Sequence, residues 1–78
     1  MERFLLFIRE KETDDVADFH PSEPAARKAL VAYARRRHRE MGRPAPINDD
    51  VAVSSYFDET AAAYTIARVT PLYDRGEG

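Results

Sequence analysis

The chain has 78 residues and no cysteine, and its 12 Lys and Arg against 14 Asp and Glu give a net charge of −2. This length suits one small domain, and the lack of cysteine excludes disulfides and thiolate metal sites. The longest apolar run, FLLFI at 4–8, is far too short to span a bilayer. We therefore expect one cytoplasmic domain over 1–78, with 74–78 as a frayed tail.

The first elements are predicted to be strands. Residues 3–12 begin with aromatic and branched apolar side chains and end charged, which is typical of a strand. Phe4, Leu6 and Ile8 share one face of it, and Leu5 and Phe7 share the other. Since both faces are apolar, this strand is expected to be central. A polar turn at 12–15 then leads to a second candidate strand at 16–20.

A long helix is predicted over 23–41. Ser22 is a favourable N-cap, Pro24 is tolerated in the first turn, and Gly42 ends the helix. Alanine, leucine, lysine and arginine, which are good helix formers, dominate the segment. Its expected buried stripe, spaced at helical intervals, is Ala26, Leu30, Tyr33, Ala34 and Met41.

The segment 51–59 admits two interpretations. Its valines and aromatics at a period of two suggest a strand, whereas the Asn48 cap and the spacing of Ala52 and Val53 below Tyr56 favour a short helix. The alternating residues of 61–72 predict the last strand.

These elements predict an α+β fold. It consists of a small antiparallel sheet of three strands packed by one long helix, with 51–59 as a second helix or a further strand. One helix covers only one face of a sheet. The apolar second face therefore needs a cover, which is 51–59, a second copy of the chain or a partner. Monomer and homodimer both stay open.

No catalytic or metal-binding motif is found, and no cofactor is expected. The serines lie outside a nucleophile turn, and the three glycines form no phosphate loop. His20 is interpreted as a strand-to-helix junction residue and His38 as a residue on the helix surface. The paired carboxylates lie in predicted turns and caps, where carboxylates are usually solvated; the pairs are Asp14/Asp15, Asp49/Asp50 and Asp58/Glu59.

The helix carries an unusual concentration of basic residues. Residues 27–43 hold seven basic side chains against one acid, a net charge of +6, whereas the rest of the chain carries −8. On a helical wheel, most of these cations project outward in one stripe, whose members are Lys28, Arg35, Arg36 and Arg39. Arg37 instead falls in the apolar stripe. Either the helix overhangs the sheet there, or Arg37 extends its charged group out of the stripe and pairs with a carboxylate from the sheet side, and we expect Arg37 to serve the fold.

Three interpretations of the outward stripe are open. It is a solvated face, a surface that binds an acidic protein, or a site for nucleic acid. The acidity of the surrounding chain weighs against nucleic acid, so a protein partner is preferred and an arginine-helix regulator of DNA or RNA is the alternative. An alternative acidic binding surface is formed by Asp14, Asp15, Asp18, Asp49 and Asp50.

The chain as a whole resembles the phage-encoded anti-CRISPR proteins. The resemblance is carried by the order of the segments RFLLFIRE, SEPAARKALVAYARRR and YFDETAAAYTIARV, by the small acidic α+β character, and by the lack of a catalytic motif. This group has no common motif, so no functional residue is transferred by position.

The resemblance implies a non-enzymatic inhibitor that acts in the cytosol of a bacterial host. Its partner would be a CRISPR effector complex, for example of type I, whose binding to target DNA it would block. The acidic surface would then imitate DNA phosphates, or the basic helix would bind an acidic subunit.

Overall fold

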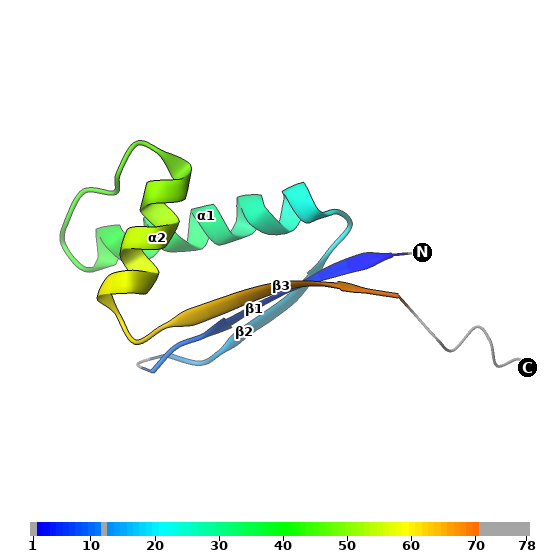
Figure 1. Ribbon diagram of the computed structural model, residues 1–78. Coiled ribbons are helices and arrows are strands. Elements are labelled where there is room, and N and C mark those ends of the chain that lie inside the picture. The colour runs from blue at the N-terminus through cyan, green and yellow to red at the C-terminus, as the bar shows by residue number, and fades with distance from the viewer. Residues whose placement is uncertain (1, 12, 71–78) are drawn as a thin grey trace, which may run out of the picture.

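The computed structural model describes residues 2–11 and 13–70 and has the predicted α+β architecture (Figure 1). Five elements follow in the order β1 (Arg3–Arg9), β2 (Val16–His20), α1 (Glu23–Glu40), α2 (Asp49–Glu59) and β3 (Ala63–Val69). The segment 51–59 is thus helical, because Asn48 accepts a hydrogen bond from the backbone amide of Val51 (3.1 Å) and caps α2. The tail predicted at 74–78 lies outside the described residues.

The sheet is antiparallel, with the strand order β2-β1-β3 and β1 in the centre as expected. Leu6 lies opposite Asp18 on β2 and opposite Ile66 on β3. The first strand ends at Arg9 rather than at residue 12, since Asp15 accepts a hydrogen bond from the amide of Glu10 (3.2 Å) where the chain turns. The last strand covers only 63–69 of the predicted 61–72, and residues 71 and 72 are outside the described part.

Both ends of α1 are capped by the residues that the sequence predicts. Ser22 accepts a hydrogen bond from the amide of Ala25 (3.2 Å) at the start. At the end, Gly42 adopts a positive φ of 79°, and the amides of Gly42 and Arg43 bond to the carbonyls of Arg39 (3.0 Å) and His38 (3.2 Å). This is a Schellman ending, which favours glycine.

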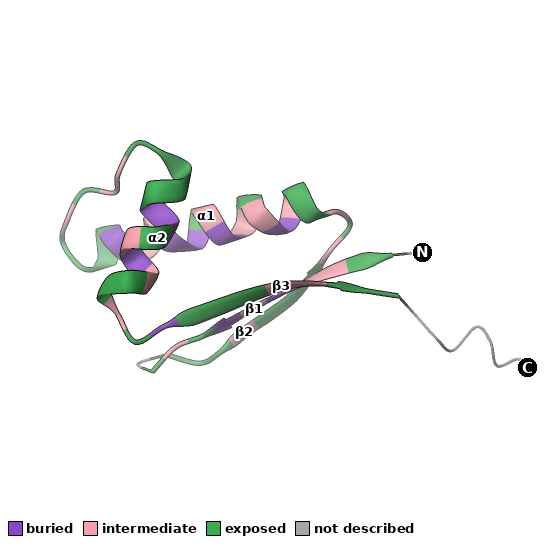
Figure 2. Ribbon diagram, viewed as in Figure 1, coloured by how far each residue is buried: buried purple, intermediate pink, exposed green. Residues whose placement is uncertain are grey.

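Both helices lie on the same side of the sheet (Figure 1). The core between them and the sheet contains Leu6 and Ile8 of β1, Leu30 of α1 and Tyr56 of α2, all essentially inaccessible to solvent (Figure 2). The second helix therefore packs beside α1 and does not cover the other face of the sheet. That face stays without a cover in the described chain.

One predicted member of the buried stripe is misplaced. Met41 is 45% exposed, because it is the C-cap of α1, where the backbone leaves the helical path. The interior position on that side is taken instead by His38, which was predicted to lie on the helix surface and is only 3% exposed.

Replacing Leu30 with alanine is expected to lower the free energy of unfolding by about 2–4 kcal/mol, because Leu30 is fully buried and its removal leaves a cavity. For a domain of this size the melting temperature should fall by roughly 10 °C or more. Thermal unfolding followed by circular dichroism measures the shift. Ile47→Ala, at a side chain that is 95% exposed, is the matched control and should change the melting temperature little. A fall of only one or two degrees for Leu30→Ala would contradict this core.

Candidate functional site

A buried polar cluster joins the sheet to both helices. Its centre is the Glu10 carboxylate, which follows β1 and is 4% exposed. The Tyr33 hydroxyl of α1 donates to Glu10 Oε2 (2.7 Å), and the Tyr56 hydroxyl of α2 donates to the same oxygen. Arg37 Nε donates to the Tyr56 oxygen (3.0 Å) and lies 4.0 Å from Glu10 Oε2.

The role of Arg37 is therefore confirmed. Its side chain points toward the apolar stripe, pairs with a carboxylate from the sheet side, and also reaches Glu40 (2.8 Å). Sequence reasoning did not identify Glu10. The available signal was its place in the alternation of the strand. Glu10 follows Leu6 and Ile8 at a period of two and therefore lies on the face that the helices cover.

The environment of the cluster shifts its pKa values. Burial, and then the hydrogen bond and the charge of Glu10, raise the pKa of Tyr33 above its usual range. Burial also raises the pKa of Tyr56, against the opposing hydrogen bond from Arg37. Hydrogen bonds to Tyr56 and Glu40 raise the pKa of Arg37. Both tyrosines are thus held neutral and serve as donors to Glu10. This arrangement is suited to stabilising a fold.

The predicted basic stripe is partly used within the fold. Arg35 donates to the carbonyls of Pro46 (2.6 Å) and Ile47 (2.7 Å) and pairs with Asp49 (2.6 Å), so it fixes the loop before α2. Arg36 pairs loosely with Glu40 (3.7 Å) and lies over the Tyr33 ring.

Two further cations of the segment 27–43 are paired. Arg27 bonds to Asp50, and Arg43 to Glu59 (2.6 Å). Within the described chain, only Lys28 and Arg39 of that segment have no carboxylate within 4 Å. Both are exposed, as predicted.

The predicted acidic surface is divided in two. Asp49 and Asp50 begin α2 and pair with Arg35 and Arg27 of α1. The other members, Asp14, Asp15 and Asp18, are exposed near and on β2. The two surfaces proposed as alternatives therefore meet and partly neutralise each other between the helices.

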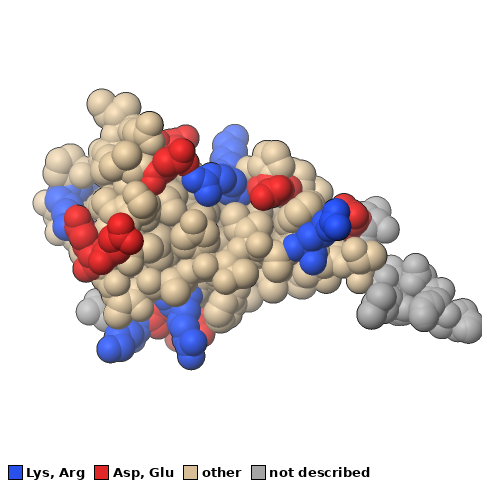
Figure 3. Space-filling model, viewed as in Figure 1, with Lys and Arg blue, Asp and Glu red and all other residues tan. Residues whose placement is uncertain are grey.

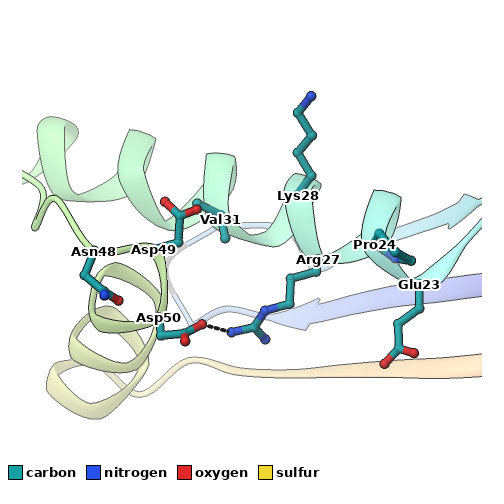
Figure 4. A pocket seen from close by; sticks show the side chains of 8 residues that line it. All are labelled: Glu23, Pro24, Arg27, Lys28, Val31, Asn48, Asp49 and Asp50. Carbon is teal, nitrogen blue, oxygen red and sulfur yellow. Dashed lines mark hydrogen bonds and ion pairs between the residues drawn. The ribbon is translucent and has the colours of Figure 1, made fainter.

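A cleft of about 820 Å³ lies where these charges meet, between the first turns of α1 and the start of α2 (Figure 4). Arg27 and Asp50 form an ion pair across it, whereas Lys28 points away. The complete lining is Glu23, Pro24, Arg27, Lys28, Val31, Asn48, Asp49 and Asp50. Its mixed charges already satisfy one another in part, and no nucleophile with a base lines it.

The two histidines have different surroundings. His20 ends β2 at the junction before α1, as predicted. His38 lies between the helices, with Nε2 at 3.1 Å from the Ala52 carbonyl and 3.2 Å from Ser55 Oγ. Because a carbonyl only accepts, the proton belongs on Nε2. His38 thus ties α2 to α1, and no cluster of three metal-ligating side chains occurs among the residues that the structure describes.

The uncovered side of the sheet carries several apolar side chains outside the core. Leu5 and Phe7 are half-buried in its centre, Phe19 on β2 lies opposite Leu5 and is 55% exposed, and Val69 on β3 is also exposed. We call this surface the open sheet face. Its apolar residues are Leu5, Phe7, Ala17, Phe19, Ala63, Ala67 and Val69.

Comparison with known proteins gives no further assignment: no family model, curated protein or solved structure matches the chain. Neither helix in the described ranges has the length and apolar character needed to cross a membrane.

Charge reversal at Arg37 is expected to destabilise the fold by roughly 3 kcal/mol, because it removes the partner of a buried carboxylate and adds a second one beside it. Arg39→Glu is the matched control two positions along α1, where the side chain is exposed, and it should change the free energy of unfolding by no more than about 0.5 kcal/mol. Urea unfolding of both variants provides the measurement. Equal effects would contradict the different placements of the two arginines.

The stability of the fold should fall as the pH rises above about 10, the usual tyrosine pKa. The folded pKa values of Tyr33 and Tyr56 are raised, so their stabilising contribution is complete below this pH and is lost as the unfolded tyrosines ionise. In Tyr33→Phe, which removes one of these groups, the free energy of unfolding should decline less steeply between pH 9 and pH 11. Denaturant titrations of the unaltered chain and of Tyr33→Phe at pH 9 and pH 11 give these free energies. An equal decline in the two proteins would refute the prediction.

Proposed function

We propose that the chain is a non-enzymatic protein-binding module. The observation that supports this most strongly is the open sheet face. Leu5 and Phe7 of the central strand, Phe19 and Val69 leave an apolar surface that no described segment covers. An exposed contiguous apolar surface on a small domain is a common mark of a protein interface.

A nucleic-acid role has less support. Of the seven cations in 27–43, five have a carboxylate within 4 Å in the described chain, which leaves Lys28 and Arg39 for phosphate contacts. Two contacts supply little of the counterion release that drives binding to duplex DNA. Lys28, Arg36 and Arg39 are instead retained as a second protein-binding surface on α1.

The resemblance to anti-CRISPR proteins gives the proposal a target class. On this proposal the chain is a stoichiometric inhibitor in a bacterial cytosol that binds a CRISPR effector complex, such as one of type I, and blocks target DNA. The inhibitor uses shape and surface complementarity and no chemistry of its own.

The test mixes the purified chain with purified type I effector complexes and measures target DNA binding by mobility shift. We expect the chain to co-elute with a complex and to reduce its DNA binding with a stoichiometric end point. The chain alone should shift neither DNA nor RNA at moderate salt.

Two outcomes would contradict the proposal. The first is a complete lack of co-elution with every effector tested. The second is a mobility shift of DNA or RNA by the chain alone that disappears in the double variant Lys28→Glu, Arg39→Glu. In that case the logarithm of the binding constant should fall with the logarithm of the salt concentration with a slope of about two. The second outcome would establish the regulator alternative.

A further inference from the structure

The open sheet face has a defined shape. Three strands about 4.8 Å apart place its outer strands about 10 Å from each other, which is close to the diameter of one α-helix. On the opposite face, α1 lies over all three strands and contributes Leu30 to the core with Leu6 and Ile8, while α2 packs beside α1. A single helix is therefore the element that fits the open sheet face across its width.

Positive charge brackets the apolar centre of this face. Arg3 and Arg9 are the first and last residues of β1 and share the face of Leu5 and Phe7 by alternation. Both arginines are exposed, and neither has a carboxylate within 4 Å in the ranges that the structure describes. Figure 3 shows cationic side chains projecting from the sheet side at the end away from the termini, next to acidic ones.

The described acids of the strands lie elsewhere. Glu10 is buried beneath the helices, and Asp18 lies opposite Leu6 and so belongs to the helix-covered side. Glu2 pairs with Arg68 (3.5 Å). Among the described residues, Asp15, at the turn before β2, is the one carboxylate that matches the open sheet face by alternation along the chain, and it accepts a hydrogen bond from the Glu10 amide.

We propose that the open sheet face binds one amphipathic helix of a partner protein, whose apolar stripe lies on Leu5, Phe7, Phe19 and Val69 and whose flanking carboxylates pair with Arg3 and Arg9. The proposal rests on the protein-binding function and specifies its surface and its ligand. Arg3 and Arg9 are about 20 Å apart at the usual rise of a strand, so the helix needs about 13 residues between its acidic groups.

A second copy of the chain fits this face less well. A two-fold interface places the same patch against itself, so the exposed Arg3 and Arg9 of one copy would meet those of the other. Asp15 is the single carboxylate that the described part of the chain adds to the patch. Like charges without counter-charges oppose such pairing. An acid-flanked helix supplies the missing negative charge.

The probe is a fluorescein-labelled peptide of about 16 residues, with leucine at helical spacing and a glutamate pair near each end, the separation following from the helix rise of about 1.5 Å. A matched peptide carries lysine in place of glutamate. We expect the chain to bind the glutamate peptide at least about tenfold more tightly, because its glutamates face Arg3 and Arg9 whereas the lysines of the matched peptide are repelled by them. In the double variant Arg3→Glu, Arg9→Glu the preference should reverse.

Two exposed apolar residues provide a test variant and its matched control. Phe19→Glu should lower the affinity for the glutamate peptide at least about tenfold, since it introduces charge at an exposed aromatic anchor. Ile47→Glu adds the same charge at an exposed residue in the loop before α2 and should leave the affinity unchanged. Circular dichroism checks the fold of each variant. On the unaltered chain, amide chemical shifts should change along β1, at Phe19 and in β3, and not in α1.

Several results would overturn the proposal. Equal affinity for both peptides would do so, as would shift changes confined to α1. A dimer in sedimentation that Phe19→Glu dissociates would assign the face to a second copy. Binding to vesicles of anionic phospholipid without binding of the glutamate peptide would assign it to a membrane. If an effector complex binds the chain and Phe19→Glu changes neither the affinity for that complex nor the affinity for the glutamate peptide, this inference fails while the proposed function stands.

Discussion

The fold depends on the carboxylate of Glu10. This one group accepts hydrogen bonds from Tyr33 of α1 and Tyr56 of α2 and faces Arg37, so the end of the central strand is tied to both helices at a single point. A small domain has little apolar area with which to fix the angle between its elements. A buried carboxylate that accepts hydrogen bonds from both helices specifies that angle more narrowly than apolar contacts do.

The small apolar area of the domain also explains the arrangement of the surface charges. The arginine-rich helix is not an isolated basic face, because Arg27 and Arg35 hold the start of α2 through Asp50 and Asp49. Arg35 also bonds two carbonyls of the preceding loop, which has no regular secondary structure to satisfy them. Much of the charge asymmetry in the sequence is therefore used to join the two helices, and the apolar side of the sheet is left as the more distinctive surface.

The sequence was sufficient to predict the order of the elements and the type of all but one, because alternation in β1 and the caps at Ser22 and Gly42 are local signals. The segment 51–59 stays open between helix and strand from the sequence alone, although its Asn48 cap favours the helix that the structure has. The sequence also placed Arg37 toward the core, since its position on the helical wheel conflicts with its charge. It did not place His38 inside or Met41 outside. Met41 is exposed because α1 ends there, whereas a helical wheel assumes that the helix continues. His38 is buried where α2 packs against α1, and a helical wheel contains no information about a neighbouring helix. The use of Arg35 by the loop was missed for the same reason, as it depends on contacts between segments that are distant in the chain.

The strand order has a consequence for how the chain folds. The central strand β1 is made first, yet one of its two partners, β3, is the last of the five described elements to be synthesised. The hairpin of β1 and β2 can form early, whereas pairing between β1 and β3 closes a loop that includes both helices, and such long-range closure is slow. During synthesis one edge of the central strand is therefore unpaired until translation has passed Val69. Leu6 and Ile8, which the folded chain buries under the helices, are shielded in that interval only to the extent that α1 packs on the hairpin before β3 is made.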